Sequence, residues 1–360
     1  MEEISTIGLD TAKSVFQVCA VDRQNVVLKN VQVKRRGVLK VFETIPCCTV
    51  ALEACGAAFH WARQLAKMGH EVKLVPPPFL KRFAGRHKSD MRDAHALALA
   101  ARDPMLRPVP LKSAEEQAGL MLVKVRSLLL RQRTQTSNSL RGHMAEFGLI
   151  GACGDKGLAL LIERIEAGDE VLPHDEVLPH DEVLPHEALN ALAILVRQWR
   201  GLNEEIAKLN AQLASHIKSN ATATRLMSVP GVGPMTALVC DMKVPDVHRF
   251  ESGRHFAAWL GLTPKQHSSG NKVKLGSITK AGDEDLRSLL VMGAASVLMH
   301  AKKYPHKADE WVKDLQKRRP FKVAAVALAA RNARIVWALM KHGTYYQAKG
   351  KCEMVHRAPQ

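Results

Sequence analysis

The spacing of apolar and polar residues at the start of the chain restricts its fold more than any other feature. Three short stretches, Ile4–Asp10, Ser14–Asp22 and Asn25–Val33, are rich in Val, Ile and Thr or alternate in polarity. Only tight connections separate them, and tight connections join antiparallel neighbours. The first part of the chain therefore predicts three antiparallel strands.

The next segments predict parallel strands joined by helices. A helical stretch near Gly37–Ile45 precedes a buried type of strand at Cys48–Cys55. An amphipathic helix at Ala58–Met68 then leads to a strand at Glu71–Val75, which Pro76 stops. Parallel strands need such crossovers. The order βββαβαβα is that of an RNase H-like α/β domain.

Four acidic residues stand out against this basic chain. Asp10 and Glu53 end two predicted neighbouring strands, while Asp90 and Asp93 share one face of a predicted helix. Each alone has a plainer reading as a turn cap, a surface charge or an acid favoured by the helix dipole. Together they predict a convergent catalytic site.

Convergence would require a cation. Two carboxylates about 4 Å apart repel by on the order of 4 kcal/mol at an effective dielectric constant near 20. Hard oxygen ligands select Mg²⁺, with Mn²⁺ as the alternative, and such ions assist phosphodiester chemistry. We therefore predict that all four acids are both catalytic and metal-binding.

The charge balance predicts a nucleic-acid partner. The 360 residues carry a formal net charge of +17, although the stretch Glu163–Glu187 is acidic. Such an excess favours phosphate neutralisation. An anionic membrane surface is the alternative, but no run of 18 apolar residues and no signal pattern is present. We therefore predict no membrane partner. The 7 cysteines show no CxxC spacing, which predicts reduced thiols and a cytoplasmic location.

The middle of the chain predicts long helices. Ser113 and Glu116 form a capping box that starts a helix bearing Arg131 and Arg133, which either contact nucleic acid or form a solvated face. Further on, apolar residues alternate in steps of four and three, which favours a coiled coil within the chain or with a partner. These residues are Leu195, Trp199, Leu202, Ile206, Leu209 and Leu213.

Residues 169–186 are the hexamer DEVLPH repeated three times. The repeated proline forbids a continuous helix. The histidines His174, His180 and His186 are possible metal ligands, but an identical tandem repeat favours expansion of a short DNA repeat within a tolerant loop.

The last third of the chain contains two candidate sites. Gly231 and Gly233, in VPGVGP, resemble the turn of a helix-hairpin-helix motif, whose backbone N–H groups can approach a phosphate, although an ordinary turn has the same composition. Ser269 is a candidate nucleophile in a basic loop, or simply part of a Ser-Gly turn. The candidate nucleic-acid contacts of this region are Lys272, Lys274, Lys280 and Arg287.

Six segments together resemble the DEDD transposases of insertion sequence family 110, subgroup 1111, to which Piv-type DNA invertases are related. They are GLDTAKSVFQV, ALEAC, KSDMRDAHAL, SVPGVGPMTA, FAAWLGLTPKQHSSGNKVKLGSITKAGDEDLR and VAAVALAARNARIVWALM. The resemblance covers nearly the whole chain. It implies a RuvC-type domain at 1–110, a coiled-coil linker at 111–220 and a mainly α-helical transposase domain at 221–360.

The resemblance also implies a mechanism. Asp10, Glu53, Asp90 and Asp93 match the DEDD metal ligands, and Ser269 matches a serine that forms a phosphoserine link to DNA, with Ser268 as the fallback. A structured non-coding guide RNA would pair with donor and target double-stranded DNA. Dimers would pair into tetramers, in which the acids of one protomer act with the serine of another.

Two other functions fit the same residues. A RuvC-like structure-specific nuclease would use the four acids with water as the nucleophile. A non-catalytic nucleic-acid-binding protein would use the basic surface alone.

Overall fold

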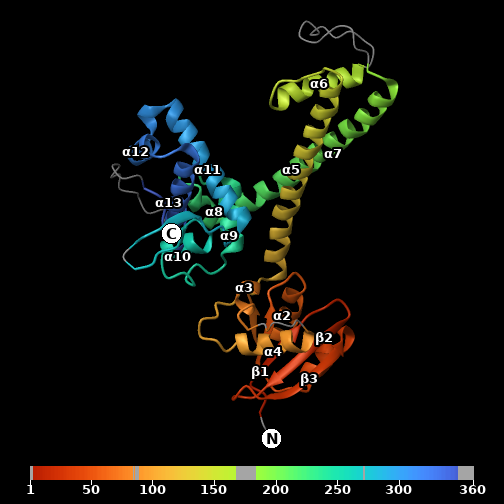
Figure 1. Cartoon of the computed structure of the whole chain (residues 1–360), viewed down its shortest axis with the longest axis vertical. Coiled ribbons are helices and arrows are strands. Elements are labelled where there is room, and N and C mark those ends of the chain that lie inside the picture. The colour runs from red at the N-terminus through yellow and green to blue at the C-terminus, as the bar shows by residue number, and fades with distance from the viewer. Residues whose placement is uncertain (1–2, 84, 86–88, 168–183, 271, 348–360) are drawn as a thin grey trace. The chain divides into compact units, whose positions relative to one another are not determined.

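The computed structural model describes residues 3–83, 85, 89–167, 184–270 and 272–347. Most of the DEVLPH repeat lies outside these residues. The chain divides into two compact units, Met1–Gln117 and Ala118–Gln360. We describe each unit by itself (Figure 1).

A five-stranded mixed sheet forms the centre of the N-terminal unit. Its strand order is β3-β2-β1-β4-β5, with β1, β2 and β3 antiparallel and with β4 parallel to both β1 and β5. The prediction of three antiparallel strands extended by parallel ones is confirmed. The strands are β1 Thr6–Asp10, β2 Val15–Val21, β3 Val27–Lys34, β4 Thr49–Glu53 and β5 Glu71–Val75.

Helices cover both faces of this sheet (Figure 1). One face packs Ile7, Leu9 and Leu52 against α1 and α2. Side chains alternate along a strand, so the residues between these face the opposite side, where α4 lies. The helices are α1 Val38–Glu43, α2 Ala58–Lys67, α3 Pro77–Leu80 and α4 Asp90–Ala100, with a 3₁₀ turn, η1, at Arg35–Gly37.

Helix α4 lies unusually close to β1 because Gly8 has no side chain. A Cβ atom on Gly8 would lie 1.8 Å from the Ala94 carbonyl oxygen. Ala94 and Ala98 are fully buried against β2. Just beyond the helix, Arg102 donates hydrogen bonds to the carbonyl oxygens of Asp22 (2.9 Å) and Arg23 (2.6 Å). These contacts fix the position of α4 on the sheet.

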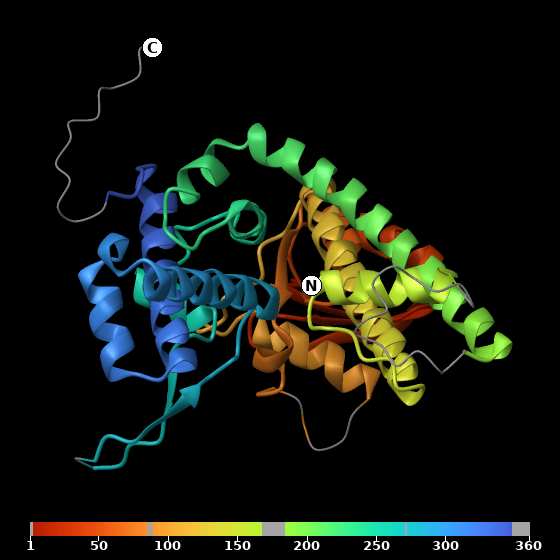
Figure 2. The same cartoon turned by 90° about the horizontal axis from the view of Figure 1, so that it is seen from above.

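Two long helices run antiparallel in the second unit (Figures 1 and 2). α5 spans Ala114–Glu146 and α7 spans His186–Lys218, with α6 at Asp155–Ala167. The Trp199 indole N–H donates to the Ser137 hydroxyl at 2.9 Å, and the Arg126 side chain donates to Asn210 at 2.5 Å.

The predicted capping box is confirmed, since Ser113 N–H donates to Glu116 (2.8 Å) and Glu116 N–H donates to the Ser113 hydroxyl (3.1 Å). Of the predicted heptad residues, Ile206 and Leu213 are buried and the other four are half-buried. At its start the stripe packs within the chain, since Leu195 and Trp199 lie against a core cluster that includes Leu140 and Met144 of α5.

The rest of the second unit is mainly helical, as predicted. Its core joins residues of α8, α9, α10, α11, α12 and α13. These helices are α8 Ala221–Leu226, α9 Pro234–Lys243, α10 Gly253–Trp259, α11 Glu284–Lys303, α12 Glu310–Arg318 and α13 Phe321–His342. A small β-hairpin, β6 Pro264–Gln266 and β7 Leu275–Ile278, projects from it, and a 3₁₀ turn, η3, lies at Pro305–Lys307.

Among the described residues, one helix, α13, is long and apolar enough to cross a membrane. Its residues Ala324, Leu328, Ala333 and Val336 are nevertheless buried in the core of this unit. That is the arrangement of a core helix.

We predict that Gly8→Ala lowers the free energy of unfolding by about 1–3 kcal/mol, because α4 must move away from β1. Urea unfolding of the full chain, followed by circular dichroism, measures the change. Gly56→Ala is the matched control, since a Cβ there meets nothing within 4 Å. Equal stabilities of the two variants would contradict the close packing at Gly8.

Candidate active site

Strand pairing brings Asp10 and Glu53 to the same edge of the sheet. In the parallel pair β1–β4, Leu9 lies opposite Leu52, so the next residue in each strand is an acid at the carboxyl end. Both acids are half-buried. They face the side that α4 covers, because Gly8 and Ala51, two residues earlier in each strand, pack on that helix.

The other two acids lie in the first turn of α4. The hydroxyl of Ser89 caps this helix by accepting a hydrogen bond from Arg92 N–H at 3.4 Å. Acids are favoured in this turn because they face the positive end of the helix dipole. Asp93 is half-buried and Asp90 is exposed.

The electrostatics of Asp10 show that the four acids are neighbours. Its pKa is raised above the usual value, first by burial and then by the negative charges of Asp93, Asp90 and Glu53. A hydrogen bond from Thr11 N–H partly opposes this rise in pKa. Residues that lie far apart in the sequence therefore form one acid cluster, defined here as Asp10, Glu53, Asp90 and Asp93.

The donor set of this acid cluster suits a hard divalent cation, because all four side chains offer carboxylate oxygens. Their spacing is wider than a metal site requires. Among the described residues, no three His, Cys, Asp or Glu side chains are close enough together to hold a metal ion. The structure thus brings the predicted ligands near one another without placing them in ligand geometry.

The candidate nucleophile lies at the tip of the β6–β7 hairpin. The Ser268 hydroxyl accepts hydrogen bonds from the Gln266 side chain (3.1 Å) and from Lys274 N–H (3.2 Å). Ser269 is exposed, and its hydroxyl has no hydrogen-bond partner within the described part of the chain. Gly270 follows with a positive φ of 56°, which allows the tight turn. The Ser268 hydroxyl is thus used within the hairpin, whereas Ser269 contributes its backbone carbonyl oxygen, which accepts from Lys272 N–H at 3.2 Å.

The predicted nucleic-acid contacts differ in their surroundings. Arg131, Lys272, Lys274 and Lys280 are exposed. Lys280 has a φ of 55°, in the left-handed region that favours glycine.

Two predicted contacts instead have structural partners. The Arg287 guanidinium donates to the carbonyl oxygens of Leu260 and Gly282, both at 3.2 Å. Arg133 donates to the Asn203 side chain at 3.4 Å. Basic composition alone did not reveal these internal hydrogen bonds.

The turn that contains Gly231 packs tightly inside its own unit. A Cβ atom on Gly231 would lie 2.9 Å from the Gly293 carbonyl oxygen in α11, and φ is 86°. Buried Asn332 of α13 donates to the Pro230 carbonyl oxygen at 2.9 Å. Gly233, by contrast, is exposed at the N-cap of α9. Gly231 shapes the turn, while Gly233 remains accessible.

Sequence reasoning missed Gly8, Arg102 and Asn332. A glycine within a strand often indicates close approach of another backbone, so Gly8 carried a usable signal. The other two carried none, because their partners are carbonyl oxygens of distant segments.

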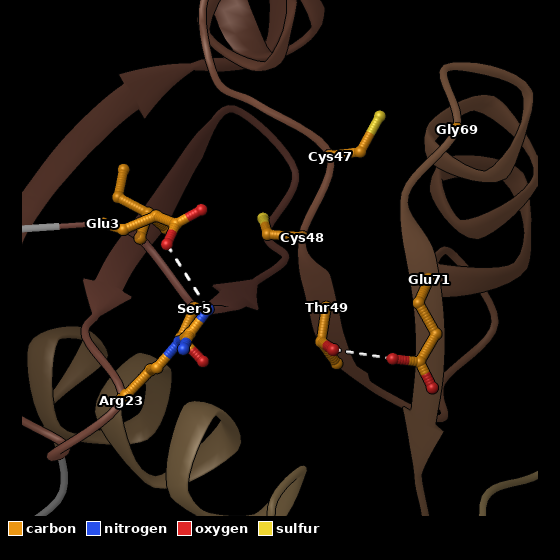
Figure 3. A pocket seen from close by; sticks show the side chains of 9 residues that line it. Glu3, Ser5, Arg23, Cys47, Cys48, Thr49, Gly69 and Glu71 are labelled. Atoms are coloured by element: carbon orange, nitrogen blue, oxygen red, sulfur yellow. Dashed lines mark hydrogen bonds and ion pairs between the residues drawn. The ribbon is translucent and has the colours of Figure 1, made fainter.

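Two pockets lie away from the acid cluster. One, of about 360 Å³, is lined by Cys47, Cys48, Thr49 and Glu71 at the edge where β4 and β5 begin (Figure 3). There the Thr49 hydroxyl donates to Glu71 at 2.6 Å and lowers the pKa of that carboxyl. The other, of about 850 Å³, lies among α11, α12 and α13. Neither pocket contains a candidate catalytic residue.

A mixed sheet carrying four clustered acids, followed in the same chain by a mainly helical unit, is the arrangement of DEDD transposases. A family model of DEDD transposases from IS110 elements matches residues 7–148, which include all four acids. A second model, described as the transposase IS116/IS110/IS902 family, matches residues 223–309, which include Ser269.

Individual relatives agree with these matches. A protein of Sinorhizobium fredii named as a transposase is 43% identical, over 98% of this chain and 88% of the relative. The transposase for insertion sequence element IS1111A of Coxiella burnetii is 36% identical, over 96% of this chain and 92% of the relative. A pilin gene-inverting protein of Moraxella lacunata is 25% identical, over 93% of this chain and 95% of the relative. The chain therefore belongs to the IS110 family of insertion-sequence transposases, a class that cleaves and transfers DNA strands.

We predict that Asp10→Asn stabilises the metal-free protein at neutral pH. The folded state raises the Asp10 pKa, so it binds that proton more tightly than the unfolded state does. Ionisation of Asp10 therefore lowers stability as pH rises above the unfolded value of 3.8. The variant should melt at a higher temperature than the wild type at pH 7, and this advantage should vanish at acidic pH.

Thermal unfolding across this pH range, in the presence of a chelator, tests the prediction. Glu43→Gln is the control, because Glu43 is an exposed acid of the same unit. A lower melting temperature for Asp10→Asn than for the wild type at pH 7 would show that burial and the neighbouring charges do not make ionised Asp10 destabilising.

Proposed function

We propose that this transposase cleaves and rejoins DNA with a RuvC-type, metal-dependent acid cluster and a serine nucleophile, guided by a non-coding RNA. The observation that carries the proposal is the meeting of Asp10 and Glu53 at one edge of the sheet with Asp90 and Asp93 of α4, and the pKa of Asp10 is raised first by burial and then by the other three acids. Such a concentration of negative charge is stabilised by a cation.

Mg²⁺ is the proposed ion, with Mn²⁺ as the alternative, held by the acid cluster. When bound, the ion would neutralise charge on the scissile phosphate and favour an ionised nucleophile. The carboxylates would orient this ion at the edge of the sheet. Asp10, which is more buried than Asp90, would be the central ligand.

We propose Ser269 as the nucleophile. Its oxygen would form a bond to phosphorus while the bond from phosphorus to the leaving deoxyribose oxygen breaks, and the serine proton would pass to solvent. A hydroxyl group of a second strand would later attack the phosphoserine and release the serine. This route conserves the phosphodiester energy, which hydrolysis would lose. The exposed hydroxyl of Ser269, which has no hydrogen-bond partner among the described residues, supports the assignment over Ser268.

Donor DNA, target DNA and a structured guide RNA are the proposed partners. The net charge of +17 supports binding to polyanions. The exposed residues Arg131, Gly233, Lys272, Lys274 and Lys280 are the proposed contacts. Three further residues already contact other parts of the protein, so their proposed role is to hold the nucleic-acid-binding surface in shape. These residues are Arg133, Gly231 and Arg287.

We further propose a functional division at 1–110, 111–220 and 221–360, and action in the bacterial cytoplasm. Dimers that pair into tetramers would combine the acids of one protomer with the serine of another. The half-buried heptad residues of α7, among them Leu202 and Leu209, would suit such an assembly.

We predict that Ser269→Ala reduces excision of the element by about 10³-fold or more, the scale expected for loss of a covalent nucleophile. Ser268→Ala is the matched control and should retain excision, with a modest loss from the weakened hairpin. The measurement is excision from a plasmid that carries the full element. Excision by Ser269→Ala at the wild-type rate would refute the serine assignment.

A trapped protein–DNA adduct separates the proposal from a nuclease that uses water. Digestion and mass spectrometry of the wild-type complex with cleaved DNA should find the end linked to Ser269. Cleavage by Ser269→Ala with no adduct in the wild type would favour the water-dependent nuclease. Sequencing of RNA that co-purifies from cells carrying the element tests the guide, and unchanged excision without that RNA would exclude it.

A further inference from the structure

A buried glutamine lies beside the acid cluster. In the antiparallel pair β1–β2, Gln17 is directly opposite Asp10. Directly opposite residues project from the same face of a sheet. Gln17 therefore shares the face that carries Asp10, and it is only 3% exposed. It is a neutral side chain on the face that carries this carboxylate.

A chain of hydrogen bonds determines which way the Gln17 amide points. The Met91 carbonyl oxygen, in the first turn of α4, can only accept, so the Asn30 amide group donates to it at 3.1 Å. The Asn30 oxygen therefore faces Gln17 and accepts from its Nε2 at 2.6 Å. This polarity forces the Gln17 oxygen Oε1 to point away from Asn30.

The Gln17 Oε1 atom is buried and has no hydrogen-bond partner among the described residues. A buried carbonyl oxygen without a partner lowers stability, so such atoms in folded proteins usually meet a donor. The four acids of the cluster accept hydrogen bonds when they are ionised and have none to donate. A water molecule held at the site would supply such a donor.

We propose that Gln17 is a positioning residue of the active site, whose Oε1 accepts a hydrogen bond from a water molecule held by the acid cluster and its cation. Asn30 fixes the orientation of this amide and ties it to the turn that carries Asp90 and Asp93. Water bound to a divalent cation is a strong donor. This inference rests on the proposed metal-dependent function, and it adds a neutral group that orients the site without adding charge.

Binding of Mn²⁺ to the full chain tests the role of Gln17 independently of DNA cleavage. The loss of the electron paramagnetic resonance signal of free Mn²⁺ gives the affinity, and thermal unfolding with a chelator gives the metal-free stability. Gln17→Met should bind Mn²⁺ about 10-fold or more weakly, the scale of other partners that orient metal ligands. Its metal-free melting temperature should stay near that of the wild type, because the change also removes an unpaired buried oxygen.

Two further variants complete the test. Asn30→Ala keeps the Gln17 oxygen but frees its orientation, so it should weaken Mn²⁺ binding less than Gln17→Met does. Gln32→Met is the matched control, since Gln32 lies opposite Gln17 in the pair β2–β3 but is exposed. It should bind Mn²⁺ as the wild type does.

Wild-type Mn²⁺ affinity in Gln17→Met would overturn the inference, as would a lower metal-free melting temperature with unchanged affinity. If Gln17→Met does not fold, Asn30→Ala decides, because wild-type affinity in that variant would equally overturn it. The proposed metal function fails separately, if the wild type binds no Mn²⁺ or if Asp10→Asn binds it as tightly as the wild type.

Discussion

The close approach of α4 to β1 is the contact on which the acid cluster depends. Asp10 and Glu53 are carried by the sheet, whereas Asp90 and Asp93 are carried by the helix, so their proximity requires the helix to lie directly on the strands. Gly8 permits this approach, because any side chain there would meet the Ala94 carbonyl oxygen. Arg102 holds the far end of the helix, and Asn30 contacts its first turn. A packing feature thus determines the geometry of the chemistry.

This packing concentrates negative charge that the protein alone does not neutralise. The raised pKa of Asp10 reflects this unfavourable electrostatic energy, since both burial and neighbouring carboxylates disfavour its ionised form. Active sites commonly contain groups with such shifted pKa values. The neutral amides of Gln17 and Asn30 suit this environment, because they can orient groups without adding repulsion.

In the second unit the candidate nucleophile, Ser269, is exposed on a hairpin, whereas three of the four acids in the first unit are half-buried. In the same unit, the side chain of Lys243 in α9 is nearly buried and pairs with Asp283 at 2.7 Å and with Asp285 at 3.0 Å. These ion pairs hold the start of α11, where the loop that follows the hairpin ends. The tip that carries Ser269 is exposed, whereas its base is anchored. An accessible hydroxyl on an anchored support suits attack on an extended DNA strand.

The sequence alone indicated three antiparallel strands extended by parallel ones, because local polarity patterns and connection lengths restrict how neighbouring segments pair. It also indicated the four acids and the serine, through their positions in recognisable motifs. Tertiary structure alone decided how the basic residues are used, since Arg133 and Arg287 bond to groups that no local pattern reveals. It likewise packed Leu195 and Trp199 of the heptad stripe against α5 of the same chain, and it left the Gln17 oxygen without a partner among the described residues. These outcomes depend on contacts between distant segments, which only the folded chain brings together.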